Sequence, residues 1–393
     1  MKKFFAFVLA FALMTGCGVR ETADSDIISA PGAADDITAG EQQTEDQTPQ
    51  LPEEPEPENI TLRFTAVGDN LIHNTLSIDS RIDGGYDFSH IYAGVADRIE
   101  GSDIAFINQE VPLDGTEGAY PTLSAPREVA AAIHDIGFNV ASLANNHMAD
   151  KGTGGLISTV EALKNAGFEG IVGGYADKET AAQPVIIEKN GVRFGFLAYT
   201  YGLNSGLGGG NDWMIDRIGR EKIQADVEAI RPLCDFLAVS MHWGTEYQKT
   251  ASDPQREYAE LLASLDVDLI IGTHPHVLQS AEWIDRDGKE QTLCIYSLGN
   301  FVSGQREEDR LLGGILELEL EFTADGQFVG YKSADIEGVV THYNYGNKGF
   351  ALYMLDDYTE ELAAAHGLHK YDLPITLGYF TDRMTGIRES IKR

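Results

Sequence analysis

Two hydrophobic patterns alternate along the chain from residue 60 onward. Short apolar runs rich in β-branched residues are typical of buried strands, whereas apolar residues that recur every three or four positions are typical of amphipathic helices. The first pattern predicts strands at 62–67, 104–107, 139–143, 236–240, 269–271 and 292–296. The second predicts helices at 92–99, 127–136, 156–165, 223–230, 254–265 and 357–366. Two antiparallel pairs are also predicted, one over 185–197 across the Asn190-Gly191 turn and one that joins 314–322 to 328–337.

Strand–helix alternation followed by hairpins predicts an α/β sandwich with mixed β-sheets flanked by helices. No break in composition divides residues 59–345, so we expect one domain over that range. Residues 346–393 are predicted to form a C-terminal extension packed on the domain.

The first seventeen residues resemble a bacterial lipoprotein signal. Two lysines precede an apolar run at 4–14, and small residues then lead to Cys17. The run has the length of a secretory signal and is short for a membrane span. The pattern predicts a signal peptide at 1–16, lipidation of Cys17 and a lipid-anchored protein on the extracytoplasmic face of the bacterial cell membrane. The alternative is an ordinary signal peptide that happens to contain a cysteine.

Residues 17–58 differ in composition from the rest of the chain. Positions 18–58 hold 12 acidic residues, one arginine and no aromatic residue, and they end in a run rich in Pro and Glu. Such a segment buries too little apolar surface to offset its ordering entropy, so it predicts a disordered, acidic tether behind the lipid anchor.

Charge and cysteine content narrow the function further. The formal net charge of -33 opposes binding to phosphate backbones, so we expect no nucleic-acid partner. With Cys17 as an anchor, only Cys234 and Cys294 remain, and their apolar surroundings predict two buried thiols rather than a disulfide.

Polar side chains follow six of the predicted strands, where ligands bind in open α/β sheets. They are Asp69, with His73 nearby; Asn108 and Glu110; Asn145, Asn146 and His147; His242 and Glu246; His274 and His276; and Asn300. Taken singly, Asp69 is typical of an Asx turn and His242 of a half-buried histidine. We expect an extended chain around Pro275 to aim the imidazoles of His274 and His276 the same way. All six junctions together predict one shared polar site, and a His/Asp/Glu/Asn set suits divalent zinc, manganese or iron.

This ordered series of motifs, over residues 61–305, resembles the CapA family. These are capsule-synthesis proteins associated with poly-γ-glutamate, and their domain is similar to calcineurin-like metallophosphoesterases. The resemblance implies a metallophosphatase-like fold and a site for divalent metal ions, up to two in number. In that site Asp69 would bind the first metal, Glu110 would bridge, and Asn146 and His242 would bind the second.

The same resemblance implies that His274 and His276 are divided between the two metals and that His147 protonates a leaving group. Asn108, Asn145, Glu246 and Asn300 would bind substrate or support the ligands. Phosphoesterases carry a histidine where this chain has Leu71, so His73 is the further candidate ligand there. A bridging glutamate in place of an aspartate is a second departure.

The resemblance implies a surface protein in capsule or poly-γ-glutamate biosynthesis or export, with the polymer or its membrane synthase as partner and a metal-dependent hydrolase activity. Two alternatives stay open: a non-catalytic scaffold that binds polymer or synthase, and an envelope or nucleotide metallophosphoesterase. The acidic domain repels any anionic substrate, so favourable contact requires metal bridging, a local basic groove or a high ionic strength that screens the repulsion. Arg81, Arg127, Lys151 and Lys249 are the candidate local cations.

Overall fold

The computed structural model of the chain describes residues 58–373 and 375–393. The predicted signal peptide, Cys17 and the predicted tether up to residue 57 lie outside the described residues. Within the ranges that are described, no helix has the length and apolar character needed to cross a bilayer.

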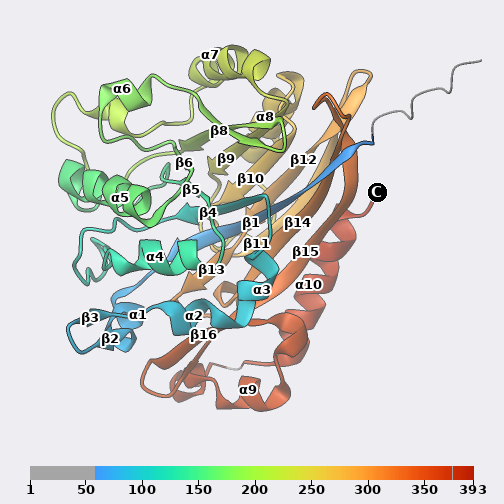
Figure 1. Ribbon diagram of the computed structural model, residues 1–393. Coiled ribbons are helices and arrows are strands. Elements are labelled where there is room, and N and C mark those ends of the chain that lie inside the picture. The colour runs from blue at the N-terminus through green and yellow to red at the C-terminus, as the bar shows by residue number, and fades with distance from the viewer. Residues whose placement is uncertain (1–57, 374) are drawn as a thin grey trace, which may run out of the picture. The chain divides into compact units, whose positions relative to one another are not determined.

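Two mixed β-sheets form the centre of the described part, with helices on their outer faces (Figure 1). In order, the larger sheet holds β16 (Lys348–Met354), β15 (Phe328–Asn344), β14 (Leu312–Phe322), β1 (Ile60–Leu71), β4 (Ile104–Gln109), β5 (Val140–Ser142) and β6 (Gly170–Val172), and β13 (Asn300–Ser303) also pairs with β1. The smaller sheet holds β11 (Leu278–Arg286), β12 (Lys289–Leu298), β10 (Leu269–Thr273), β9 (Phe236–His242), β8 (Val192–Thr200) and β7 (Val185–Lys189). The predicted α/β sandwich with mixed sheets is confirmed.

Each sheet combines a parallel part with antiparallel strands. In the larger sheet β1, β4, β5 and β6 are parallel, and β14, β15 and β16 continue from β1 in antiparallel pairs. In the smaller sheet β8, β9, β10 and β12 are parallel, and β7 and β11 are antiparallel edge strands. Parallel strands present their carboxyl ends at one edge of each sheet, which is where the polar junctions of the sequence fall.

Apolar side chains from both sheets meet in one core. The ring of Phe64 on β1 lies 6.1–6.4 Å, centroid to centroid, from the rings of Phe194, Phe196 and Phe236 on β8 and β9. Alternate residues of β9 serve different cores, because Phe236 packs between the sheets while Leu237 packs under the helices. This burial on both faces explains the continuous apolar runs of the parallel strands.

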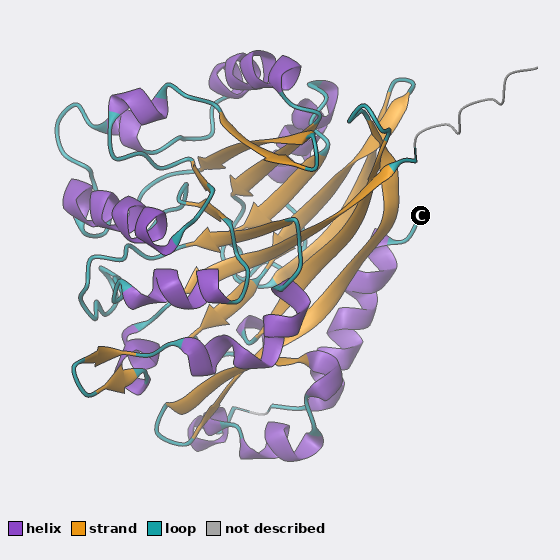
Figure 2. Cartoon of the chain, viewed as in Figure 1, coloured by secondary structure: helices purple, strands orange, loops and turns teal. Residues whose placement is uncertain are grey.

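Helices cover the outer faces (Figure 2). Helices α7 (Arg220–Ile230) and α8 (Asp253–Ser264) place Ile223 and Leu262 in the core beneath the smaller sheet. A capping box joins Ser252 to Gln255 at the start of α8, as the sequence Ser-Asp-Pro favours. The other helices and short strands are α1 (Asn74–Asp79), β2 (Arg81–Ile82), β3 (Gly85–Tyr86), α2 (Ser89–Tyr92), α3 (Ala96–Ile99), α4 (Glu128–Asp135), α5 (Gly152–Ala166), α6 (Lys178–Ala181), α9 (Glu360–Ala365) and α10 (Leu377–Ile391).

Most predicted elements are confirmed, and the differences are local. The predicted helix 92–99 is broken, since a 3₁₀ turn at Ala93–Val95 separates α2 from α3. The hairpin turns at Asn190 (φ 51°) and Gly191 (φ 83°), as expected for Asn-Gly. Cys234 and Cys294 are free and buried, as predicted.

Residues 346–393, predicted as an extension packed on the domain, supply an edge strand and two helices. Strand β16 pairs with β15 in the larger sheet. Helix α10 contacts β11 and β15, and its end is held where Trp283 Nε1 donates to the carbonyl of Ile391 at 2.8 Å. The sequence pattern missed β11, β16 and α10.

Candidate metal centre

Strand register brings the predicted polar residues together. Asp69 on β1 lies opposite Asn108 on β4 and Asn300 on β13, and His242 on β9 lies opposite Thr273 on β10. Each of these residues stands at the carboxyl end of its strand, or at the start of β13. The side chains predicted to share a site therefore start from neighbouring backbone positions.

A close backbone approach fixes Asp69 beside β13. A Cβ atom on Gly68 would lie 1.9 Å from the carbonyl oxygen of Gly299, so only glycine fits at residue 68. The next amide, that of Asp69, donates to the same carbonyl at 2.9 Å. The Gly-Asp sequence after the first strand thus positions the carboxylate rather than serving as an Asx turn.

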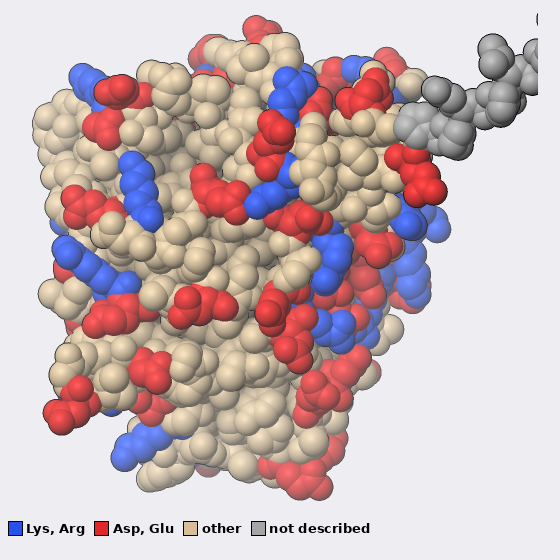
Figure 3. Space-filling model, viewed as in Figure 1, with Lys and Arg blue, Asp and Glu red and all other residues tan. Residues whose placement is uncertain are grey.

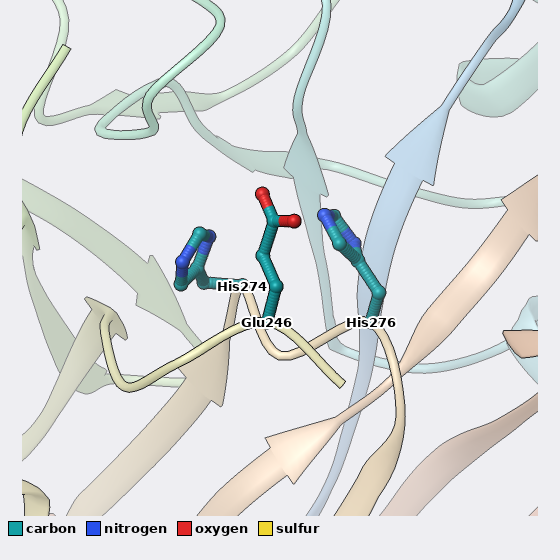
Figure 4. A group of neighbouring side chains, drawn as sticks. All are labelled: Glu246, His274 and His276. Carbon is teal, nitrogen blue, oxygen red and sulfur yellow. The ribbon is translucent and has the colours of Figure 1, made fainter. Parts of the chain in front are cut away.

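Two groups of three residues have the arrangement of metal ligands. In the first, one ligand atom each of Asp69, Glu110 and His242 lies within 4.8 Å of the others. In the second, the same holds for Glu246, His274 and His276. Figure 4 shows the Glu246 carboxylate between the two imidazole rings.

The two groups touch each other through His276. Its Nδ1 lies 3.1 Å from Asp69 Oδ2, and its Nε2 lies 3.6 Å from Glu110 Oε1. The His242 Nε2 atom is 3.9 Å from the same Glu110 oxygen. The six side chains therefore form one continuous cluster, and Glu110 stands at its centre.

The backbone around Pro275 is not extended, so the reason given for aiming both imidazoles together was wrong. His274 (φ 95°) and His276 (φ 58°) have positive φ angles, a backbone conformation that residues other than glycine rarely adopt. The ring centroids still lie only 5.9 Å apart. A tight turn, rather than strand alternation, brings the two rings to one site.

The cluster leaves buried polar atoms without protein partners. Among the described residues, both oxygens of Glu110 and Nδ1 of His274 are buried and accept or donate no hydrogen bond. An unpartnered buried polar group costs about 1–3 kcal/mol, and a buried charge costs more. A cation bound here would offset that cost, so the donor set fits a divalent metal ion.

Burial and neighbouring charge set the protonation of these groups. Burial raises the pKa of Glu110 well above its usual value, and the Asp69 carboxylate raises it further. Burial also raises the pKa of Asp69, but the hydrogen bonds from His276 and Asn108 outweigh it, and the pKa lies below the usual value. Burial lowers the pKa of His274 to about 4 and that of His242 well below its usual value. Both imidazoles are therefore neutral at pH 7 and keep the lone pair that a metal ligand needs.

Hydrogen bonds behind the imidazoles orient them. His276 Nδ1 lies 3.0 Å from Asn300 Oδ1, an atom that only accepts, so this contact places the proton on Nδ1 and leaves Nε2 open toward Glu110. His242 Nδ1 lies 2.9 Å from Thr273 Oγ1, which can accept its proton and leave a lone pair on Nε2. That Nε2 lies 3.0 Å from Asn146 Oδ1, so the two atoms predicted to share one ion lie side by side. Asn300 thus contacts a predicted ligand, and Thr273 makes a similar contact that the sequence did not reveal.

His147 lies beside the cluster in a pair with Asp150. Its Nδ1 donates to Asp150 Oδ2 at 2.7 Å, and its Nε2 lies 3.5 Å from Asn204 Nδ2. Asp150 is itself held by the amide of Leu123 at 2.8 Å and by the hydroxyl of Ser205 at 3.3 Å. This pairing fixes the ring and leaves Nε2 as the atom that can exchange a proton with a ligand.

The remaining predicted residues have different surroundings. Asn108 donates to Asp69 Oδ1 at 2.8 Å, and Asn145 donates to the carbonyl of Gln109 at 2.8 Å. His73 belongs to neither ligand group, since its Nδ1 accepts from the amide of Gly304 at 3.2 Å. It therefore does not replace the ligand whose position Leu71 occupies.

Sequence reasoning missed some residues of the site. Glu246, predicted only to orient a ligand or support the site, lies within a ligand group, and Asp150, three residues after His147, went unnoticed. Tyr201 was also missed, although its ring lies 4.5 Å from that of His274. The spacing His-x-x-Asp was the one available signal for Asp150. The positions of Glu246 and Tyr201 in the site depend on tertiary contacts, which the sequence does not show.

Several known proteins are similar to this chain in sequence. The sequence model of the family described as bacterial capsule synthesis protein PGA_cap matches residues 63–305. A Bacillus anthracis protein named capsule biosynthesis protein CapA is 32% identical over 266 residues, which are 63% of this chain and 61% of that protein. A Bacillus subtilis (strain 168) protein named PGA biosynthesis protein CapA is 27% identical over 213 residues, which are 52% of this chain and 53% of that protein.

The chain therefore spans between about half and three fifths of the length of these curated relatives. A solved structure of a hypothetical protein from Thermus thermophilus aligns with 70% of this chain and 99% of that one, with 16% identity and a TM-score of 0.42.

Proposed function

The chain belongs to the bacterial capsule synthesis protein family PGA_cap, and on that premise we propose that it acts in the synthesis or export of a capsule polymer such as poly-γ-glutamate. The names of its Bacillus relatives, capsule biosynthesis protein and PGA biosynthesis protein, support this proposal. We further propose that its part in that process is metal-dependent hydrolysis at the cluster around Glu110.

One observation carries the hydrolase proposal. The two ligand groups meet where His276 Nε2 lies 3.6 Å from Glu110 Oε1, and the buried oxygens of Glu110 have no hydrogen-bond partner among the described residues. A divalent ion held by this cluster would supply Lewis-acid polarisation of an ester or amide oxygen and activation of a water molecule. Asp69, Glu110 and His242 would hold one ion, and Glu246, His274 and His276 a second.

The residues of this chain have distinct tasks in the proposed reaction. Asn300 keeps the proton of His276 on Nδ1, so that Nε2 faces Glu110 with a lone pair. Thr273 fixes the ring plane of His242 through Nδ1, and Asn146 Oδ1 lies beside Nε2 as a further oxygen donor. Because Asn108 anchors the Asp69 carboxylate from the other side, the ligands are held before any ion binds.

His147 is the proposed general acid. With Nδ1–H donated to Asp150, a proton held at Nε2 can be passed to the oxygen or nitrogen of the leaving group. The Asp150 carboxylate accepts from Nδ1 and so fixes which ring nitrogen faces the leaving group. Its own contacts with Leu123 and Ser205 keep it in place during turnover.

A substrate screen tests the proposal. The purified protein, loaded with manganese, zinc or iron(II), is assayed on γ-glutamyl amides, poly-γ-glutamate and phosphomonoesters. His147→Ala should lower kcat about 10²- to 10⁴-fold, which is the usual contribution of a general acid. His90→Gln is the matched control, because that imidazole is 40% exposed and pairs with Asp79 away from the cluster.

The outcomes separate the candidate functions. Turnover of γ-glutamyl substrates that depends on His147 supports the capsule hydrolase, and turnover of phosphomonoesters alone supports an envelope or nucleotide phosphoesterase. A protein that binds poly-γ-glutamate or a membrane synthase without any turnover is a non-catalytic scaffold, and that result contradicts the hydrolase.

We also propose that Cys17 is lipidated and anchors the protein on the extracytoplasmic face of the cell membrane. The lipobox-like residues before Cys17 support this, and the capsule lies on the same side of the membrane. Cys17→Ser should yield a protein that stays uncleaved or is released from the membrane fraction. Unchanged processing and membrane retention of that variant would contradict the anchor.

A further inference from the structure

Tyr247 stands at the edge of the second ligand group in an unusual backbone conformation. It directly follows Glu246, its φ is 67°, and its amide donates to the carbonyl of Pro275 at 2.8 Å. Its ring centroid lies 6.1 Å from that of His276. Seven non-glycine residues in the described part of the chain have a positive φ, and Tyr247, His274 and His276 are three of them. Strain of this kind persists where surrounding contacts impose it, and it gathers at functional sites.

Arg310 covers the ring of Tyr247. Its Cζ atom lies 3.4 Å from the ring centroid, and its side chain is only 17% exposed. One Nη atom pairs with Glu307, while Nε is buried without a hydrogen-bond partner among the described residues. Because Nε is buried, the donors that a ligand can reach are those of the Nη atoms, which the stacking holds in position.

Arg310 is tied to the ligand cluster through its backbone. Its carbonyl accepts from Asn300 Nδ2 at 2.9 Å, and Asn300 Oδ1 lies 3.0 Å from His276 Nδ1. Tyr247 on one side and Asn300 on the other thus connect this arginine to the same imidazole. Such support places a charge more accurately than a free surface lysine would.

Three of the four basic residues predicted for this task, Lys151 being the fourth, are engaged with side chains away from the ligand groups. Arg81 pairs with Glu117, Lys249 lies 2.8 Å from Asp309, and Arg127 Nε donates to Ser158 at 2.8 Å. On the face drawn in Figure 3, acidic and basic side chains are interspersed rather than separated into a basic area. An anionic substrate of this acidic chain therefore needs a cation placed at the site itself.

We propose that Arg310, stacked on Tyr247, binds an anionic oxygen group of the substrate next to the Glu246–His274–His276 group. The assignment rests on the proposed function, and it names the substrate class as one with a carboxylate or phosphate beside the reacting bond. A planar guanidinium suits both anions, because it offers parallel N–H donors to two oxygens. In poly-γ-glutamate the group is the α-carboxylate of a γ-linked residue.

Equilibrium binding tests the assignment with two probes, poly-γ-glutamate of defined length and inorganic phosphate. The full chain is titrated as the parent, as Arg310→Gln and as Arg310→Lys, and metal content and melting temperature are recorded for each. We expect about ten-fold weaker binding of the recognised anion by Arg310→Gln, since charged hydrogen bonds contribute this much. Arg310→Lys should recover part of the loss, and metal content should not change.

Arg306→Gln is the matched control. Arg306 lies in the same segment, and its Cζ is 4.7 Å from the ring centroid of Tyr371, so the same charge and the same stacking are removed elsewhere. If Arg310→Gln binds poly-γ-glutamate more weakly than the parent does, the group that Arg310 recognises is a carboxylate. If it binds inorganic phosphate more weakly, that group is a phosphate. Equal binding of both probes by parent and Arg310→Gln, or an equal loss in Arg306→Gln, would overturn the assignment. If the protein shows no turnover but its binding of the anion still depends on Arg310, the hydrolase proposal is contradicted and the assignment of the Arg310 site is supported.

Discussion

At the start of β10, the buried carboxylate of Asp268 is surrounded by donors. Arg231 Nη1 lies 2.6 Å from Oδ2, the amide of Leu237 donates to the same oxygen at 2.8 Å, and Arg286 Nη1 lies 3.1 Å from Oδ1. At the other end of the same strand, His274 and the neighbouring Glu110 are equally buried but keep atoms without hydrogen-bond partners among the described residues.

The difference separates two uses of a buried charge. At Asp268 each oxygen is neutralised by the protein, so the group can only contribute to holding the fold together. At Glu110 the protein supplies a second carboxylate and neutral imidazoles instead of cations. An ion from solution would neutralise the charge at Glu110. We therefore call the Asp268 end of β10 the structural end, and the end at His274 with the neighbouring Glu110 the binding end.

The largest expected effect is at the structural end. Asp268→Ala leaves Arg231 and Arg286 without their carboxylate, and loss of one member of a buried pair costs about 3–5 kcal/mol. Urea unfolding of the purified protein measures the change. A loss below about 1 kcal/mol would mean that Asp268 is as dispensable as a surface charge, and the comparison would fail.

A pH dependence comes next in size. Burial lowers the pKa of both His274 and His366 to about 4, from the ordinary 6.5. The unfolded chain therefore binds more protons than the folded chain between pH 4 and 6.5, and stability rises with pH across that window. Each histidine contributes roughly 3 kcal/mol, at about 1.4 kcal/mol per pKa unit.

His274 lies at the binding end and His366 lies outside it, so the two histidines distinguish the pH dependence of the metal site from that of the rest of the fold. His366 Nδ1 accepts from the amide of Leu368, and its Nε2 faces the carbonyl of Thr341, so His366 has no role in ion binding. Urea unfolding at pH 4.5, 5.5 and 6.5, with EDTA or with added metal, measures both contributions. His366→Gln should flatten the profile equally in both conditions, and a flattening that depends on metal would place His366 in the binding end.

Ion binding should raise the free energy of unfolding only when the ligand residues around Glu110 are intact. An ion present at 100 times its Kd adds about 2.7 kcal/mol to the free energy of unfolding of the parent. The increment should vanish in Glu110→Gln, whereas the EDTA-treated variant should be at least as stable as the parent, because a buried carboxylate with a raised pKa has been removed. An ion-free Glu110→Gln that is clearly less stable than the parent would assign Glu110 a structural role.

The smallest effect is expected for a surface pair outside both ends. Lys189 Nζ lies 2.7 Å from Glu169 Oε1, with side chains 24% and 42% exposed. Lys189→Gln should change the free energy of unfolding by less than about 1 kcal/mol, because water and salt screen exposed pairs. A larger change would show that charge removal in general, rather than burial, sets the effect at Asp268.

The sequence predicted most strands that build both ends, because their apolar runs are long and bounded by glycine or polar residues, but it missed the short strand β13 that carries Asn300. It also predicted the site residues that directly follow those strands, such as Asp69 and His242. It missed the edge strand β11, whose outer residues mix charge with apolar side chains, and β16, which pairs only with β15. In α10, Phe380, Met384 and Ile387 have helical spacing, but Gly378 and Gly386 weaken the pattern.

Other parts of the site depend on contacts between distant segments. The left-handed turn at His274 and His276 is held by Tyr247, from the loop after β9, and by Asn300, which lies 24 residues beyond His276. The place of Glu246 within a ligand group likewise follows from the path of the loop after β9. Neither feature has a local sequence signal, so periodicity alone could not predict them.

Metal analysis of the purified full chain tests the central claim most directly. Parent, Glu110→Gln and His276→Gln are dialysed against manganese, zinc or iron(II) and then against metal-free buffer, with His366→Gln as the control for a buried histidine elsewhere. The account predicts at least one bound ion per chain in the parent and the control, and a clear loss in both cluster variants. A parent that retains no ion, or cluster variants that retain as much as the parent, would contradict it.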